Sequence, residues 1–203
     1  MNGKSITTTL DLVFRWITKL AFVNLLWIFF SFVGLGILGI FPATIATLGV
    51  VRSWLKGNTD VKIWSTFKQI YKQEFKYANT LGLILVIAGI LLYFNFIIIQ
   101  QAQGEFPFVI PFLFYFVLFL YLCIVIWSFP LTAHNYASVF QQLKNALILG
   151  ITKIHITIIL ILLLFSITYF SLDYPVLLLF FTFGLLGLAW MWFTFRVFVK
   201  IFK

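Results

Sequence analysis

The side chains that could carry chemistry in this chain are few, and most of them interrupt long apolar runs. Neutral polar residues stand in such runs at Asn24, Thr44, Thr47 and Asn95. Inside a membrane, groups of this kind form hydrogen bonds between helices. Gathered around one cavity, they would instead form a polar lining for a neutral solute such as a sugar. The sequence is compatible with both interpretations.

A second feature is a potential buried ion pair between Arg52 and Glu74. Residues 61–77 place aromatic and aliphatic side chains at three- and four-residue spacing, which is typical of an amphipathic helix. Glu74 falls on the apolar side of this helix, where an unpaired carboxylate is costly. Arg52 is a suitable partner for it. The alternative is that Glu74 extends to lipid headgroups near the helix end.

Signatures of catalysis and of metal binding are absent from the sequence. No GxxxxGK[ST] phosphate-binding loop occurs, His134 and His155 are the only histidines, and the acidic residues do not cluster. Cys123 is the single cysteine, which excludes an internal disulfide and a thiolate metal site. We therefore expect no enzymatic activity, no cofactor, and no catalytic or metal-binding residues.

The elements that position these residues follow from the composition. The chain is 63% hydrophobic and only 9% charged, against roughly 25% charged residues in a soluble domain. Apolar runs recur, and stretches such as ILVIAGILLYFNFIII are apolar on every face, which disfavours a β-barrel. We predict an all-α polytopic membrane protein, with residues 1–203 forming a single integral membrane domain. The net charge of +9 then indicates contact with anionic lipid and not with nucleic acid.

Five segments are long enough to cross a bilayer, and a shorter sixth accompanies them. The five cover residues 20–40, 78–99, 108–130, 149–171 and 176–196, and the short one covers 43–56. The positive-inside rule places all 14 basic residues on the cytoplasmic side if the short segment returns to that side. A re-entrant pair of the first two segments gives the same charge layout. We expect a multi-pass protein of the bacterial cell membrane with both termini in the cytoplasm.

The return of the short segment requires a turn, which we predict at Phe41 and Pro42. Proline suits the first turn of a helix, where its missing N–H has no intrahelical partner to lose. The three glycines before it, Gly34, Gly36 and Gly39, suit a bend or close packing.

Two amphipathic segments are predicted to lie at the cytoplasmic surface. The first covers 61–77, with lysines opposite its aromatic face, and the second covers 134–150. After the second segment, Lys153 and His155 begin an apolar run. They either extend to the inner interface or face the helix bundle, toward Glu74.

Several short motifs are similar to those of a known family. They are Asn-Leu-Leu-Trp at 24–27, Gly-x-x-Pro-Ala-Thr at 39–44, Arg-x-Trp-Leu-x-Gly at 52–57 and FPLTAHNYASVFQQLKNALILG from residue 129. Together they resemble the YesL family of bacterial integral membrane proteins, whose molecular function is unknown. The resemblance covers nearly the whole chain and brings no site residues with it. Members lie near genes for carbohydrate uptake and breakdown, which implies a role connected with sugar import.

The sequence is therefore compatible with two functions. The first is an accessory component of carbohydrate uptake or utilisation, which binds a transporter or a regulatory membrane partner. The second is a small transporter or channel for a neutral solute, which requires the four polar residues to line one cavity.

Overall fold

A computed structural model describes residues 3–102 and 107–201, with side chains from residue 10 onward. Within these ranges every regular element is a helix: α1 (Gly3–Val33), α2 (Ile37–Leu55), α3 (Ile63–Gln101), α4 (Val109–His134), α5 (Val139–Thr152), α6 (Ile154–Asp173), α7 (Pro175–Phe180) and α8 (Thr182–Ile201). The prediction of an all-α protein is confirmed.

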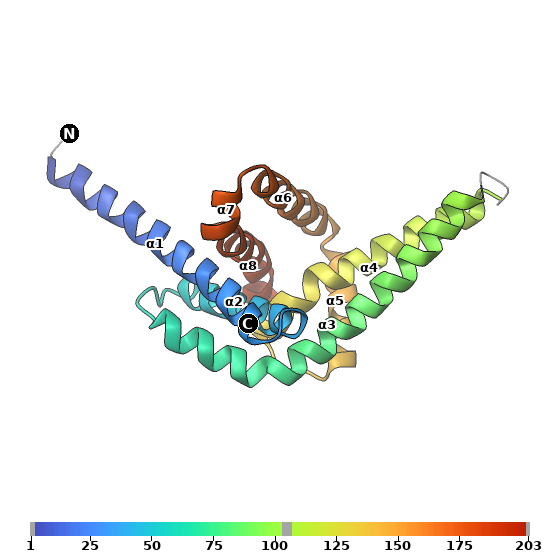
Figure 1. The fold of residues 1–203 in the computed structure, drawn as a ribbon, viewed down its shortest axis with the longest axis horizontal. Coiled ribbons are helices and arrows are strands. Elements are labelled where there is room, and N and C mark those ends of the chain that lie inside the picture. The colour runs from blue at the N-terminus through green and yellow to red at the C-terminus, as the bar shows by residue number, and fades with distance from the viewer. Residues whose placement is uncertain (1–2, 103–106, 202–203) are drawn as a thin grey trace.

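Six of the described helices are long and apolar enough to cross a membrane. They are residues Leu10–Val33 of α1, together with α2, α3, α4, α6 and α8. The number of predicted segments is thus confirmed, and the second, at 19 residues, is shorter than the first. Figure 1 shows α1 and the α3–α4 hairpin extending to opposite sides of a centre that contains α2.

The predicted turn at Phe41 and Pro42 is wrong. The chain turns at residues 34–36, and α2 begins at Ile37, so Pro42 lies inside α2 and not in its first turn. Leu35 and Gly36 both have positive φ, 61° and 74°, a backbone region that glycine adopts without strain. The Cα atoms at 34 and 39 pack so closely that a Cβ on Gly34 would collide with the backbone of Gly39. The glycines, not the proline, make this turn.

The amphipathic segment 61–77 and the span 78–99, which we predicted separately, form the single 39-residue helix α3. Figure 1 shows α3 changing direction part way along its length. In the first half Phe67, Tyr71 and Glu74 are buried, and the rings of Phe67 and Tyr71 pack against Phe30 of α1. The apolar face of this half therefore packs on the protein.

The last third of the chain also has boundaries that differ from the predicted ones. The second amphipathic segment is α5, which starts after Ser138 caps Gln141 N–H. It ends at a break at Lys153, so α6 starts later than predicted. Thr157 fixes this break, because its hydroxyl donates to the carbonyls of Gly150 and Lys153 over 3.0 and 3.3 Å. Residues predicted as the final span divide between α7 and α8.

The centre of the fold is α2. It packs against α1, α3, α4 and α8, and 61% of its span is buried, more than in the other candidate spans. Small residues make this packing close: Gly49 admits the Ile70 side chain of α3, and Gly187 of α8 admits the methyl group of Thr47. Two faces of α2 therefore border different neighbours, and each face lines its own cavity.

Candidate functional site

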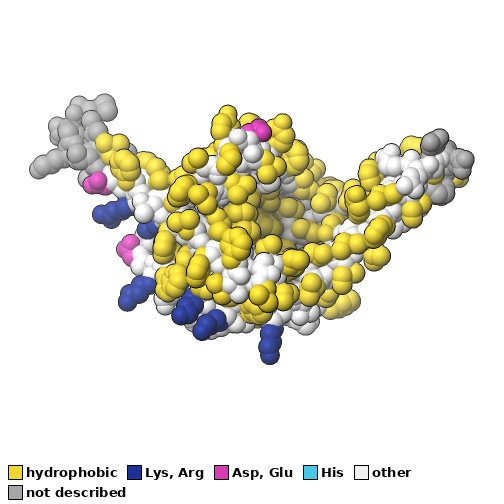
Figure 2. Space-filling view, viewed as in Figure 1, with side chains coloured by type: hydrophobic (Ala, Val, Ile, Leu, Met, Phe, Trp, Pro, Cys, Tyr) yellow, Lys and Arg dark blue, Asp and Glu magenta, His cyan; other side chains and the backbone are white. Residues whose placement is uncertain are grey.

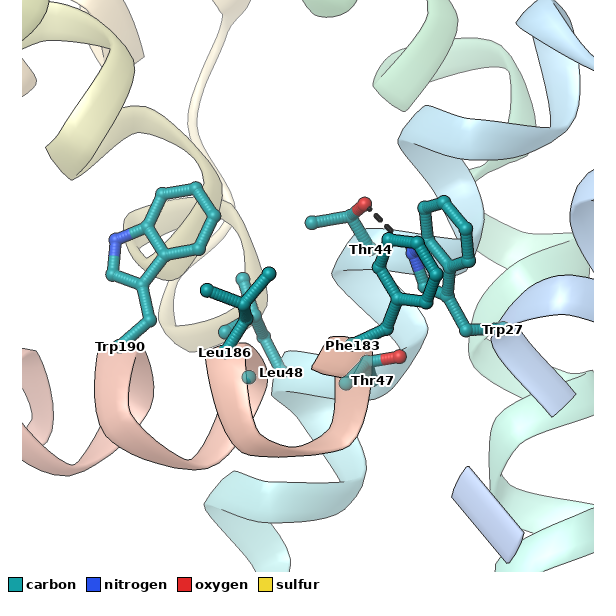
Figure 3. Close-up of a pocket in the computed structure, with 8 residues that line it drawn as sticks. Trp27, Thr44, Thr47, Leu48, Phe183, Leu186 and Trp190 are labelled. Carbon is teal, nitrogen blue, oxygen red and sulfur yellow. Dashed lines mark hydrogen bonds between the residues drawn. The ribbon is translucent and has the colours of Figure 1, made fainter. Parts of the chain in front are cut away.

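The first cavity, called here the aromatic cavity, lies between α1, α2 and α8 and has a volume of about 210 Å³. Its lining is mostly apolar and includes no charged side chain. The eight lining residues are Trp27, Thr44, Thr47, Leu48, Phe183, Leu186, Gly187 and Trp190. Figure 3 shows Trp27 and Phe183 together at one end and Trp190 at the other, with the two threonines of α2 on the same side as Trp27.

The end of the aromatic cavity that holds Trp27 is rigid. The rings of Trp27 and Phe183 stack with centroids 3.5 Å apart and an angle of 13° between their planes. The Trp27 indole N–H donates to Thr44 Oγ1 over 3.1 Å, and the Thr44 hydroxyl donates to the Ile40 carbonyl over 2.8 Å. The Trp27 indole N–H and the Thr44 hydroxyl thus each have a fixed partner. At the opposite end, Trp190 is held by its own N–H, which donates to the Ile126 carbonyl over 2.7 Å.

Thr47 differs from Thr44 in one respect. Its side chain is buried, and its hydroxyl has no hydrogen-bond partner among the described residues. Buried hydroxyl groups are nearly always hydrogen-bonded, because an unpaired one costs about 1–3 kcal/mol. A polar group in this position, on the wall of a cavity, is available to a ligand.

Asn24 lies beside the aromatic cavity and does not line it. Its amide N–H group donates to the carbonyls of Leu178 and Leu179, and its oxygen accepts from the backbone N–H groups of Phe183 and Gly184. These backbone groups belong to the end of α7 and the start of α8, where helices have unpaired carbonyl and N–H groups. Asn24 therefore fixes the α7–α8 junction and, with it, the position of Phe183.

Asn95 is separate from this group. Its side chain is exposed on the second half of α3 and donates to the Leu91 carbonyl of its own helix over 2.8 Å. Of the four polar residues proposed as a lining, the structure brings Thr44 and Thr47 into one cavity, places Asn24 next to it, and leaves Asn95 apart.

The second cavity, called here the polar chamber, lies against another face of α2 and has a volume of about 130 Å³. Arg52 and Glu74 both line it, together with residues of α4 and the loop after it. The Arg52 guanidinium donates to the Ala133 carbonyl over 3.2 Å, and the Glu74 carboxylate interacts with the hydroxyl of Tyr136. The predicted partners thus share one chamber, and each interacts with a different group.

Tyr136 lines the polar chamber from the α4–α5 loop. Its ring is 82% exposed, yet its hydroxyl reaches the buried carboxylate. Loss of water around the hydroxyl, and then the negative charge and hydrogen bond of Glu74, raise the pKa of Tyr136. Arg52 opposes this rise and is the smaller effect. The phenol therefore stays a neutral donor to Glu74 over the physiological pH range.

Sequence reasoning missed the aromatic residues of the first cavity and Tyr136 and His134 of the second. Trp27 and Phe183 are 156 positions apart in the chain, and only tertiary packing brings them together. The sequence signal that was available is local. Trp27 precedes the glycine turn, and Tyr136 lies two residues after the end of α4. Lys153 and His155, considered as neighbours of Glu74, line a different pocket between α6 and α8.

Comparison with known proteins places these features in a family context. Residues 20–96 match the family model described as "Protein of unknown function, DUF624". The chain is 31% identical to YesL of Bacillus subtilis (strain 168) over 202 residues, covering 96% of this chain and 91% of YesL. It is 30% identical to YteU of the same organism, covering 92% of this chain and 84% of YteU.

A third relative, YesV of Bacillus subtilis (strain 168), is 29% identical and covers 91% of this chain and 88% of its own length. No solved structure matches the chain. The matched region from residue 20 to residue 96 contains Trp27, Thr44, Thr47, Arg52 and Glu74. The resemblance found in the motifs is confirmed, and the chain belongs to the DUF624 family of YesL-like membrane proteins.

Proposed function

We propose that this protein is an accessory membrane component of carbohydrate uptake or utilisation, and that its part is to bind a neutral, sugar-like solute in the aromatic cavity. The observation that supports this proposal is the unpaired hydroxyl of Thr47 in the wall of a cavity bounded by two tryptophans. The role is one of binding and not of catalysis.

The chemistry of the cavity favours a neutral polar ring. Small-molecule sites are mostly apolar, with a few polar groups that fix the orientation of the ligand. The faces of aromatic rings carry partial negative charge, which suits the C–H groups on the flat side of a pyranose ring. Thr47 can exchange a hydrogen bond with a ligand hydroxyl. A charged ligand would meet no opposite charge among the eight lining residues.

A contact with a transporter or a regulatory membrane partner is the second part of this proposal. Four lysines are exposed at the start of α3 and along its first half: Lys62 at the N-cap, and Lys68, Lys72 and Lys76 within the helix. The opposite side of this half is packed on α1 and α2. Figure 2 shows basic side chains along this edge of the molecule, whereas hydrophobic side chains cover most of the rest of the visible face. A fixed row of lysines suits an acidic surface of a partner.

Uptake of labelled carbohydrates in cells lacking this chain tests the accessory role. We expect restored uptake when the wild-type chain or Thr168→Val is expressed, and reduced uptake with Thr47→Val. Thr168 is a matched control because it is exposed and its hydroxyl donates only within α6. Equal uptake of every carbohydrate with and without the chain would contradict the proposal.

Co-purification from native membranes tests the partner. We expect Lys72→Glu to lose a co-purifying membrane protein that the wild-type chain and Lys144→Glu retain. Lys144 is an exposed lysine on α5 and has the same charge change. A partner that is retained equally by both variants would exclude the α3 lysines as its docking surface.

Transport of the neutral solute is the alternative function, and the position of the aromatic cavity on the central helix favours it. Flux of the solute into proteoliposomes that contain only this protein distinguishes the two. Concentration-dependent flux that Thr47→Val reduces would support a transporter. Binding without flux would support the accessory role.

A further inference from the structure

A third cavity joins the ends of two candidate spans, at the start of α6 and the end of α8. Four basic side chains line this cavity, which we call the basic pocket: Lys153, His155, Arg196 and Lys200. Its volume is about 330 Å³. The end of α6 is linked to the start of α8 through α7. The start of α6, near residue 153, and the end of α8, near residue 200, therefore lie at the same end of this helix pair.

Contacts with the surrounding structure hold the backbone at Lys153 and the side chain of Arg196. Lys153 lies at the break between α5 and α6, and Thr157 donates to its carbonyl there. The Thr157 hydroxyl is itself held by the buried indole N–H of Trp127 over 2.9 Å. On α8, the Arg196 guanidinium lies over the ring of Trp192, 3.5 Å from its centroid. Such a contact orients the guanidinium and leaves its N–H groups available.

The lining of the basic pocket contains no acidic residue to neutralise these charges. Its other lining residues are Ile156, Phe193, Val197 and Ile201. The pocket thus combines a cationic rim with apolar walls. A phosphate group accepts hydrogen bonds from guanidinium and ammonium groups, and apolar walls suit the glycerol and acyl carbons attached to a lipid phosphate.

We propose that the basic pocket binds the phosphate-bearing headgroup of an anionic phospholipid. Both helices that form it are long and apolar enough to cross the bilayer, so their ends lie at the depth of lipid headgroups. Basic pockets between membrane helices at the bilayer surface bind headgroups of this kind. Free phosphate would use the cationic rim and gain nothing from the four apolar residues, which is why the lipid is the better match.

Native mass spectrometry of the purified full-length protein in neutral detergent tests this proposal. The protein is offered equal amounts of phosphatidylglycerol and phosphatidylcholine, and the retained lipid is counted. We expect preferential retention of phosphatidylglycerol by the wild-type chain. Lys153→Gln combined with Arg196→Gln removes two charges and should weaken retention about 25-fold, at about fivefold per charge.

The matched control is Arg15→Gln combined with Lys144→Gln, which removes two exposed charges from α1 and α5. This pair should retain phosphatidylglycerol like the wild-type chain. Gel filtration establishes that both double variants are folded. If the pocket pair does not fold, Lys200→Gln alone, at an exposed position in the last turn of α8, should weaken retention about fivefold.

Three results would overturn the proposal. Equal retention of the two lipids would show that the pocket does not recognise the headgroup charge. An equal loss in both double variants would indicate general attraction by the net charge. Displacement of the lipid by inorganic phosphate, or by an acidic peptide, at concentrations comparable to that of the lipid would show that the ligand is not a phospholipid.

Discussion

The indole of Trp27 on α1 stacks on the ring of Phe183 on α8 and donates its N–H to Thr44 on α2. One side chain therefore joins the three helices that enclose the aromatic cavity. Because the stacking contact and the hydrogen bond act on the same ring, the cavity wall is fixed by the protein's own contacts. Preorganised walls reduce the side-chain entropy that the protein must lose when a ligand binds.

Trp27→Phe tests this relationship. Phenylalanine keeps an aromatic ring for stacking on Phe183 and removes the donor to Thr44. We expect the free energy of unfolding to fall by about 1 kcal/mol, the usual net value of one hydrogen bond. Denaturant unfolding in detergent measures it. Trp64→Phe is the control, since Trp64 is 47% exposed. Its effect on the free energy of unfolding should stay within about 0.5 kcal/mol. Equal losses in the two variants would contradict the role of the Trp27 indole N–H.

Thr47→Val should increase stability. Valine has nearly the shape of threonine, and the substitution removes a buried hydroxyl that has no partner among the described residues. We expect a gain of about 1 kcal/mol, because burying an unpaired polar group is unfavourable. Thermal unfolding of the ligand-free protein measures it, with Thr168→Val as the neutral control. A loss of stability would mean that the hydroxyl is satisfied within the protein.

Asn24→Ala should be strongly destabilising. The substitution removes the side chain that pairs four backbone groups at the α7–α8 junction. Buried donors and acceptors left without partners cost about 1–3 kcal/mol each before relaxation, and we expect a loss of about 3 kcal/mol. Asn95→Ala, at an exposed site, should change stability by less than about 0.5 kcal/mol. Similar losses in the two variants, measured by denaturant unfolding, would rule out this role for Asn24.

Tyr136→Phe should alter the dependence of stability on pH. The raised pKa of Tyr136 means that the folded protein keeps this proton more tightly than the unfolded chain. Below the ordinary tyrosine pKa of about 10, the neutral phenol makes its full contribution to the free energy of unfolding. This contribution is lost as the pH rises through the higher pKa of Tyr136 in the folded protein. Unfolding measured from neutral to alkaline pH should show a steeper decline for the wild-type chain than for the variant. Parallel curves would contradict the contact with Glu74.

Periodicity and composition predicted the class of fold. The thickness of the bilayer sets the length of the apolar segments, and its apolar interior determines where charged residues can stand. The turn between α1 and α2 was misplaced by a few residues. Pro42 suggested a helix start, whereas the decisive contact is the approach of Gly34 to Gly39, which depends on two helices already packed together. The sequence also did not show that segment 61–77 and the following span form one helix. This too depends on tertiary packing, since the buried face of α3 packs on α1 and α2.

The candidate site was predicted in part. Thr44 and Thr47 are conspicuous as polar residues in an apolar run, and they line the cavity. The tryptophans and Phe183 could not be selected, because 21% of the chain is aromatic and abundance does not indicate which rings converge. Arg52 and Glu74 line the same chamber, and the ion pair predicted between them stays a prediction. Arg52 donates to the carbonyl of Ala133 in the last turn of α4. Glu74 interacts with Tyr136, which lies in the loop after α4, and the sequence leaves the position of that loop open.

Equilibrium binding of neutral saccharides to the purified protein, measured by isothermal titration calorimetry, tests the proposed role of the aromatic cavity most directly. The account predicts saturable binding of at least one saccharide, about fivefold weaker in Thr47→Val, as loss of one hydrogen bond implies, and unchanged in Thr168→Val. Absence of saturable binding across the saccharides, or equal affinities in the two threonine variants, would contradict it.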